Sequence, residues 1–291
     1  MKKLIKFHLG SLLFISNLAG ADESSFTGLG DLGGGSVESQ AYAVNPDGSV
    51  VVGYGSTDSG SEAFRWTSSG MVGLGDLFGG IDQSVAYAVN NDGSVIVGLS
   101  NSTSGGEAFI WTSATGMLGL GDIIGGSDDS AAYGVSGDGS VIVGQGSSAF
   151  GTEAFRWTSA TGMLGLGDLV GGTTTSVAYG VSDDGSVIVG RGNSASGTEA
   201  FRWSNDVMVG LGDLNGGIFH SVAYAVNNDG SVVVGYSKST SGTEAFRWSN
   251  DVMVGLGDLD GGSFDSRAFG VNVDGSVIVG SSDSASGTEA F

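Results

Sequence analysis

The sequence predicts an all-β fold, a six-bladed β-propeller of four-stranded antiparallel blades. Two observations predict it: a GLGDL motif (once GLGDI) and a DGS motif each recur six times at intervals of 45 or 46 residues, and each unit holds four short apolar segments. A period in this range is typical of solenoids, propellers and arrays. The motif aspartates are Asp31, Asp76, Asp122, Asp168, Asp213 and Asp258 for GLGDL, and Asp47, Asp92, Asp138, Asp184, Asp229 and Asp274 for DGS.

The four apolar segments of each unit are predicted to be strands. In the first full unit they are Ala41–Asn45, Ser49–Tyr54, Glu62–Trp66 and Met71–Leu77. They are short, rich in Val, Tyr, Phe and Trp, and bounded by Gly, Asp and Ser, as strands are. No window of the sequence shows the apolar period of a helix.

The link between the first two strands predicts a tight hairpin. Pro46 has no N–H to close a two-residue turn, so a three-residue loop fits better, with a type I turn through Pro46 and Asp47 and a left-handed Gly48. Such a hairpin makes the two strands antiparallel, which argues against a parallel β-helix.

The side-chain pattern predicts that each sheet is covered on both faces. Small and large residues alternate in Ala41-Tyr42-Ala43-Val44, and the next strand is apolar on both sides. A sheet with one wet face would alternate apolar with polar residues. Blades that stack small face against large face, as in a propeller, satisfy this pattern.

The two ends of the repeat array predict how the ring closes. The array begins with the GLGDL of residues 28–32 and stops within a third strand at Glu289-Ala290-Phe291. We expect the N-terminal GLGDL to complete the last blade, so that no long edge stays exposed. The alternative is an open β-repeat array truncated from a longer one, because Phe291 precedes the Arg-Trp that other copies carry.

Composition indicates an exported, acidic, glycine-rich chain. Residues 1–21 resemble a secretory signal peptide, with three early lysines, an apolar run too short to span a bilayer, and Ala19-Gly20-Ala21 as a cleavage site. Residues 22–291 would form the propeller, with no transmembrane segment. There is no Cys, and the net charge of −21 disfavours nucleic acid as a partner. We expect a secreted protein, extracellular or on the bacterial cell surface.

The repeated words also resemble a known family. EAFRW after Ser-Gly-Thr, together with AYxVxxDGSVVVG and GLGDLxGG, resembles the HAF-type extracellular repeats of bacterial secreted proteins and autotransporter passengers. The resemblance implies an adhesive or interaction role. Glu62 and its counterparts stand where the family has His, so no role of that His is carried over. A more distant similarity is to kelch-type blades, which supports the propeller.

Candidate chemistry is sparse, and the sequence predicts no enzyme, cofactor or metal site. His220 is the only histidine after the signal, and one imidazole makes neither a metal site nor a triad. The Glu and Arg of EAFRW are expected to pair with each other. The turns Asn90–Gly93 and Asn227–Gly230 only echo a calcium loop.

The copies differ most in the links after the fourth strand, which are expected to be loops that open on one face of the disc. These links hold Phe219, His220, Phe264 and Arg267, our candidate ligand-binding residues. The predicted function is a binding or adhesive module for an extracellular protein or carbohydrate. The alternatives are a glycosidase or lyase, whose carboxylates would meet at the axis, and a passenger fragment without a function. Asp82, Asp128 and Asp265 break the repeat, but are expected in peripheral links.

Overall fold

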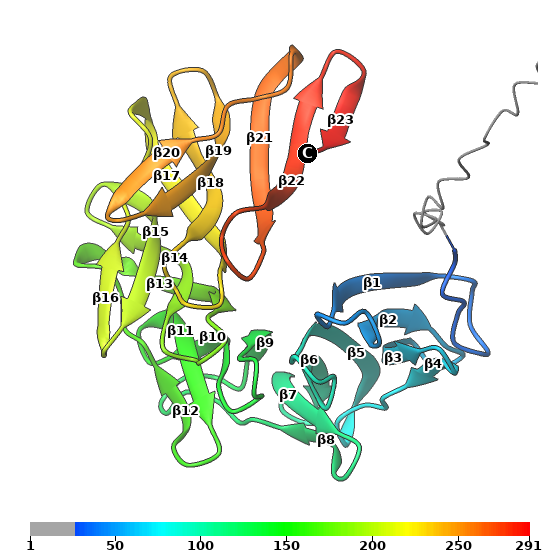
Figure 1. The fold of residues 1–291 in the computed structure, drawn as a ribbon. Helices are drawn as coiled ribbons and strands as arrows, with labels where there is room; N and C mark the ends of the chain where they lie inside the picture. Colours follow the sequence, from blue (N-terminus) through cyan, green and yellow to red (C-terminus); the bar gives the residue numbers. More distant parts are fainter. Residues whose placement is uncertain (1–26) are drawn as a thin grey trace, which may run out of the picture.

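The computed structural model describes residues 27–291, so the predicted signal peptide at residues 1–21 lies outside the described part of the chain. The described residues form 23 strands in six successive units (Figure 1). The first three units are β1 (Ser39–Val44), β2 (Val51–Ser56), β3 (Ser61–Thr67) and β4 (Gly70–Gly73); β5 (Gly79–Val89), β6 (Val95–Ser102), β7 (Gly106–Thr112) and β8 (Gly116–Gly119); and β9 (Ser130–Val135), β10 (Ile142–Ser148), β11 (Gly151–Thr158) and β12 (Gly162–Gly165).

The last three units repeat the pattern. They are β13 (Gly171–Val181), β14 (Ile188–Ser194), β15 (Gly197–Ser204) and β16 (Val207–Gly210); β17 (Gly216–Val226), β18 (Val233–Ser239), β19 (Thr243–Ser249) and β20 (Val252–Gly255); and β21 (Gly261–Val271), β22 (Ile278–Ser284) and β23 (Gly287–Ala290). We call these units blades 1 to 6. No helix in residues 27–291 is long and apolar enough to cross a membrane.

Each blade is an antiparallel meander, as the sequence predicts. The strands pair in chain order, and the fourth strand pairs only with the third. The first strands of successive blades contact one another, so they converge on the axis while the fourth strands lie outermost. The predicted all-β propeller architecture is confirmed.

The DGS hairpins have the predicted conformation. Gly48 lies at φ 73°, and its N–H donates to the Asn45 carbonyl at 2.9 Å. The Asp47 carboxylate accepts from the Ser49 N–H at 2.9 Å, which together with the Ser49 hydroxyl lowers the pKa of Asp47. The Gly of all six DGS turns has the same left-handed conformation.

The DGS turns also bind one another around the axis. In blades 2 to 5 the residue before the DGS Asp donates its N–H to the same position of the next blade, as from Asn91 to Gly137 at 3.2 Å and from Gly137 to Asp183 at 2.9 Å. Pro46 has no N–H to give. There the Asn45 side chain donates to the Asn91 carbonyl at 3.3 Å instead. These bonds draw the six turns together at one end of the channel.

The hydrophobic core lies between blades. Val187 and Val189 of blade 4 pack against Ala223, Val233 and Phe246 of blade 5, all nearly inaccessible to solvent. Equivalent clusters fill the interfaces of blade 1 with blade 2, blade 2 with blade 3, blade 3 with blade 4, and blade 5 with blade 6. The prediction that both faces of the sheets are covered is therefore confirmed for these interfaces.

In the five GLGDL segments from residue 73 onward, a buried serine of the following blade and the EAFRW glutamate of the preceding blade bind the backbone. In blade 4, Ser176 Oγ accepts from the Ala154 N–H at 3.0 Å and donates to the Gly167 carbonyl at 2.8 Å. Glu153 Oε1 accepts from the Gly167 N–H at 2.9 Å. The prediction that the Glu and Arg of EAFRW pair with each other is wrong, because the glutamate carboxylate accepts a hydrogen bond from a GLGDL backbone N–H instead. Within residues 27–291 the one ion pair joins Arg267 to Asp265.

The ring is open between blade 1 and blade 6. Figure 1 shows the first blade (blue) and the last (red) apart, and no strand of blade 1 pairs with one of blade 6. Val279 of blade 6 is 52% exposed, whereas its counterpart Val189 is fully buried. Val44 on the facing side of blade 1 is 57% exposed.

The expectation that the N-terminal GLGDL completes blade 6 is wrong for this structure. Gly30 accepts a hydrogen bond from Ser39 Oγ of blade 1 at 2.9 Å, as Gly75 does from Ser84 Oγ of blade 2. Leu32 lies against Gly55, also in blade 1. Within residues 27–291, β23 pairs with β22 and with no other strand, so residues 28–32 add no strand to blade 6.

Candidate functional site

A β-bulge in the first strand of every blade turns one aromatic side chain toward the channel. In blade 4, Ala178 pairs with Gly190 and Gly180 with Val189, which leaves Tyr179 unpaired between them. A bulged residue bends the strand and re-aims its side chain. The residues in this position are Tyr42, Tyr87, Tyr133, Tyr179, Tyr224 and Phe269.

These six aromatic residues, which we call the aromatic floor, touch around the axis. Successive ring centroids from Tyr42 to Phe269 lie 5.5 to 5.8 Å apart and are tilted, a favourable aromatic geometry. Burial, with the neighbouring phenols, raises the pKa of Tyr133 to about 12. Its hydroxyl therefore stays protonated at neutral pH.

On the side of the floor away from the DGS turns, the copies diverge. The second-strand residue next to the channel is Tyr in two blades and a different residue in each of the other four, whereas its partner in the first strand is Val in three blades. We call these twelve positions the variable layer: Tyr54, Leu99, Gln145, Arg191, Tyr236 and Ser281, paired with Gln40, Val85, Ala131, Val177, Val222 and Arg267.

Blades 4 to 6 place a cluster of cations and aromatic rings in this layer. His220 Nε2 lies 3.1 Å from the Tyr236 hydroxyl. The Arg267 guanidinium carbon stands 5.4 Å from the centre of the Tyr236 ring, a cation–π contact. Arg191 Nε donates to the Tyr179 hydroxyl at 3.1 Å, which ties the cluster to the aromatic floor.

Burial and the neighbouring charges together favour the neutral form of the histidine. Burial, followed by the positive charges of Lys238 and Arg191, lowers the pKa of His220, so its imidazole is neutral at pH 7. Lys238 Nζ donates to Thr243 Oγ1 at 2.6 Å. Arg267 donates to Asp265 at 3.0 Å, with 42% of its side chain exposed. We call Arg191, His220, Lys238 and Arg267 the basic cluster.

Two of the four predicted binding residues belong to this cluster. His220 and Arg267 meet around Tyr236. Phe219 and Phe264 do not join them: each is half-buried, beside Gly197 and Gly242 of the preceding blade. Their role in binding stays a prediction.

The expected loops after the fourth strand are in fact strands in blades 2, 4, 5 and 6. β17 begins at Gly216 and β21 at Gly261, so all four predicted residues are in strands. The extension forms because His220 bridges in parallel to Thr198, and Asp265 to Thr243, in the third strand of the preceding blade. Asp265 therefore lies beside the basic cluster, so the expectation that it lies in a peripheral link is wrong.

Sequence reasoning missed Arg191 and Tyr236. Both lie in second strands that otherwise match the repeat closely. Aligning the six copies would have found them, since the residue after Val-Val-Gly or its equivalent is Tyr, Leu, Gln, Arg, Tyr or Ser.

The polar groups of the other candidates are used within the fold. In the turn Asn90–Gly93, Asn90 Oδ1 accepts from the Val95 N–H and Asp92 Oδ1 from the Ser94 N–H, each at 2.9 Å. Within residues 27–291 no three His, Cys, Asp or Glu side chains gather in a way that could hold a metal ion.

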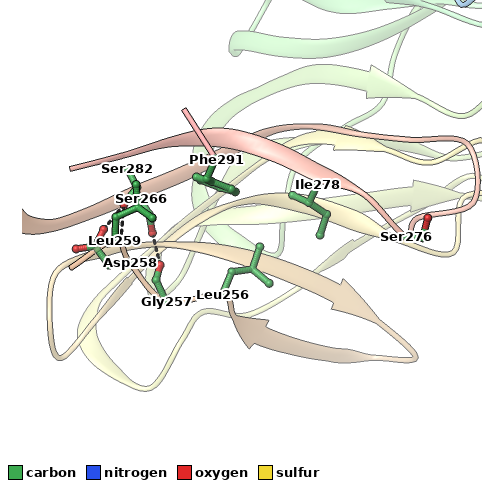
Figure 2. Close-up of a pocket in the computed structure, with 9 residues that line it drawn as sticks. All are labelled: Leu256, Gly257, Asp258, Leu259, Ser266, Ser276, Ile278, Ser282 and Phe291. Atoms are coloured by element: carbon green, nitrogen blue, oxygen red, sulfur yellow. Dashed lines mark hydrogen bonds between the residues drawn. The ribbon is translucent and has the colours of Figure 1, made fainter. Parts of the chain in front are cut away.

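One cavity lies between blades 5 and 6 (Figure 2). It measures about 300 Å³, and Leu256, Leu259, Ile278 and Phe291 line its apolar part. At the preceding interface the corresponding space is packed with Trp248 and Met253, from a third and a fourth strand. The cavity is therefore an unfilled packing position of blade 6, which has no fourth strand in the described part of the chain.

Comparisons with known proteins support the fold. No protein-family model matches the sequence, and neither does any curated protein. Among solved structures, a TolB protein from Agrobacterium tumefaciens matches with a TM-score of 0.51 and 13% identity, over 75% of this chain and 80% of that one. TolB from Acinetobacter baumannii gives 0.50 and 12%, over 87% of this chain and 62% of that one. A structure from a study of two prolyl endopeptidases gives 0.52 and 9%, over 86% and 40%. At these identities the likeness concerns the fold alone.

Proposed function

We propose that this protein is a secreted or cell-surface binding module that holds an extracellular ligand in the variable layer of its channel. The observation that carries the proposal is the contrast between two adjacent layers. The aromatic floor is nearly the same in six blades, whereas the second-strand residues of the layer beside it are Tyr, Leu, Gln, Arg, Tyr and Ser. Rigid folds commonly carry their binding residues as variable side chains at one opening of a conserved scaffold.

The signal-like N-terminus and the resemblance to HAF-type repeats support the extracellular setting and an adhesive or interaction role. We place the proposed binding in the channel rather than on the loops. The candidate side chains stand on paired strands rather than on loops, so their positions are fixed by the backbone ladder. Groups held in this way lose little conformational freedom when a ligand arrives.

We propose a non-enzymatic role because the carboxylates with raised pKa values occur as structural repeats. Burial, and to a smaller extent the charge of the nearby glutamate, raises the pKa of Asp76 and of its counterparts Asp122, Asp168 and Asp213. These aspartates belong to the GLGDL segments between blades. Asp265, the carboxylate nearest the basic cluster, is paired with Arg267. A glycosidase would need two carboxylates in distinct environments across a substrate.

The test is binding of the full chain to an array of purified extracellular glycans and matrix proteins. We expect at least one ligand to be retained by the native chain and lost by a double variant, Tyr236→Ala in the variable layer with Tyr179→Ala in the aromatic floor beside it. The matched control is Phe150→Ser, which removes an aromatic side chain that is 83% exposed in the turn between β10 and β11. Absence of any ligand, or loss of binding only in the control, would refute the proposal.

A further inference from the structure

The geometry points to an anionic ligand: we infer that the basic cluster binds the carboxylate of an acidic sugar, as in a polyuronate chain. This inference rests on the proposed binding function and deepens it.

The basic cluster gathers nearly every cation that the repeat does not require. Seven Lys and Arg residues follow residue 26, in a chain with 31 acidic residues. Four of them are the Arg of EAFRW: Arg65, Arg156, Arg202 and Arg247. The other three, Arg191, Lys238 and Arg267, all belong to the basic cluster, although they come from three blades. Unlike charges spread over a surface, charges gathered in one layer create a local positive potential.

Several donors of the cluster are free to meet a ligand. In residues 27–291, Arg191 uses Nε for Tyr179, and neither of its terminal nitrogens donates a hydrogen bond. Arg267 uses one terminal nitrogen for Asp265. A guanidinium presents paired N–H groups that match a carboxylate in a bidentate geometry, so each arginine retains a way to bind one.

The surroundings favour a sugar over an acidic peptide. Tyr224 lies 5.5 Å from both Tyr179 and Phe269 and 5.9 Å from Tyr236, so aromatic rings border the cations on the floor and within the layer. The polar groups among them are phenol hydroxyls, an imidazole and guanidiniums, which suit the hydroxyl groups of a sugar ring.

The other half of the layer lacks cations. Blades 1 to 3 present Gln40, Tyr54, Leu99 and Gln145 at the corresponding positions, with Asp129 where blade 5 has His220. The carboxylates close to the basic cluster are Asp265 and Asp283; hydrogen bonds from Ser263 and Thr288, and to a smaller extent the Arg267 charge, lower the pKa of Asp283. An anion would therefore sit off the axis, toward blades 4 to 6.

The experiment measures binding of oligogalacturonate to the full chain by calorimetry, at low and at physiological salt. We expect Arg191→Ala and Arg267→Ala each to weaken binding by tenfold or more, and added salt to weaken it as well. The matched control is Arg156→Ala, which removes the same charge from EAFRW in blade 3 and should bind like the native chain. Equal melting temperatures among the variants show that the fold is kept.

A second readout follows the His220 imidazole by NMR, assigned with His220→Gln because His8 also titrates. A bound carboxylate should raise the pKa of His220, since a nearby anion favours the protonated ring. Binding of the neutral polymer dextran or of poly-glutamate with equal or greater affinity would overturn the acidic-sugar inference and leave the binding function standing. Unchanged binding in both cluster variants, or an unmoved His220 pKa, would also overturn it. Failure of every ligand on the extracellular array would instead remove the proposed function itself.

Discussion

The opening between blades 1 and 6 makes one valine position a direct probe of the ring in solution. Val189 is fully buried against blade 5, and its counterpart Val279 in blade 6 is 52% exposed. Truncating Val189 to Ala removes two methylene equivalents, about 1.6 kcal/mol of transfer free energy. The cavity left behind raises the cost to roughly 2–3 kcal/mol. At Val279 only about half of the transfer free energy is at stake, and no closed cavity forms, so the cost is about 0.8 kcal/mol.

Thermal unfolding followed by circular dichroism converts these costs into temperatures. At roughly 2–4 °C per kcal/mol for a chain of this size, Val189→Ala should lower Tm by about 4–12 °C and Val279→Ala by no more than about 3 °C. Because repeat proteins can open blade by blade, hydrogen exchange of the β22 amides provides the local measurement. It should be faster than exchange of the β14 amides.

The comparison of the two valines decides whether the open ring persists. Equal destabilisation by the two substitutions, with β22 as protected as β14, would mean that blade 1 covers blade 6 in solution. In that case the open ring described here would be refuted. The facing cavity of about 590 Å³, lined by Tyr42 and Val44 of blade 1 and Val279 of blade 6, would then be closed.

Three further predictions concern hydrogen bonds and carboxylates of the repeat. Ser176→Ala leaves the Ala154 N–H buried without its acceptor and should cost roughly 1–3 kcal/mol in denaturant unfolding, while Ser39→Ala, at an exposed position, should cost much less. An equal cost at both would contradict the role of the blade contact. Burial raises the folded-state pKa of Asp168, so its charge opposes folding above that pKa; Asp168→Asn should raise Tm at pH 7, and the gain should vanish as pH falls through the folded pKa. If Asp168→Asn still raised Tm in acid, the charge of the carboxylate would not be the cause of the gain. Hydrogen bonds from Ser186 lower the pKa of Asp184, so its stabilisation is present above pH 4 and lost as pH falls through the folded pKa. Asp184→Asn should therefore lower Tm at pH 7 but not in strong acid, and an equal loss at both pH values would show that the carboxylate charge is not the cause.

Much of each blade follows from local sequence. The four strands, the left-handed Gly48 of the hairpin and the burial of both sheet faces are fixed by turn chemistry and by side-chain alternation within about 45 residues. These rules act between residues close in the chain, so six copies of the pattern specify six similar blades. The six-fold repetition of GLGDL and DGS therefore predicted the architecture.

The candidate site depended on contacts that no single copy contains. A one-residue bulge turns Tyr179 toward the axis, and bulges have no signal in this alternation of small and large residues. Parallel bridges between blades extend β17 and convert the expected loop around His220 into a strand. The glutamate of EAFRW binds a GLGDL backbone amide rather than an arginine, because that amide would otherwise lie unpaired between blades.

The sequence alone therefore determined what a blade is, because strand period and turn conformation are local properties. The tertiary structure alone decided which residues of different blades come together at the candidate site and where the ring opens. Radial stacking brings Arg191, Tyr236 and Arg267 together from three separate blades, and it places the opening of the ring between blades 1 and 6. Charge clustering and ring closure depend on distances across the axis, and these are set by how blades pack rather than by the order of residues within one blade.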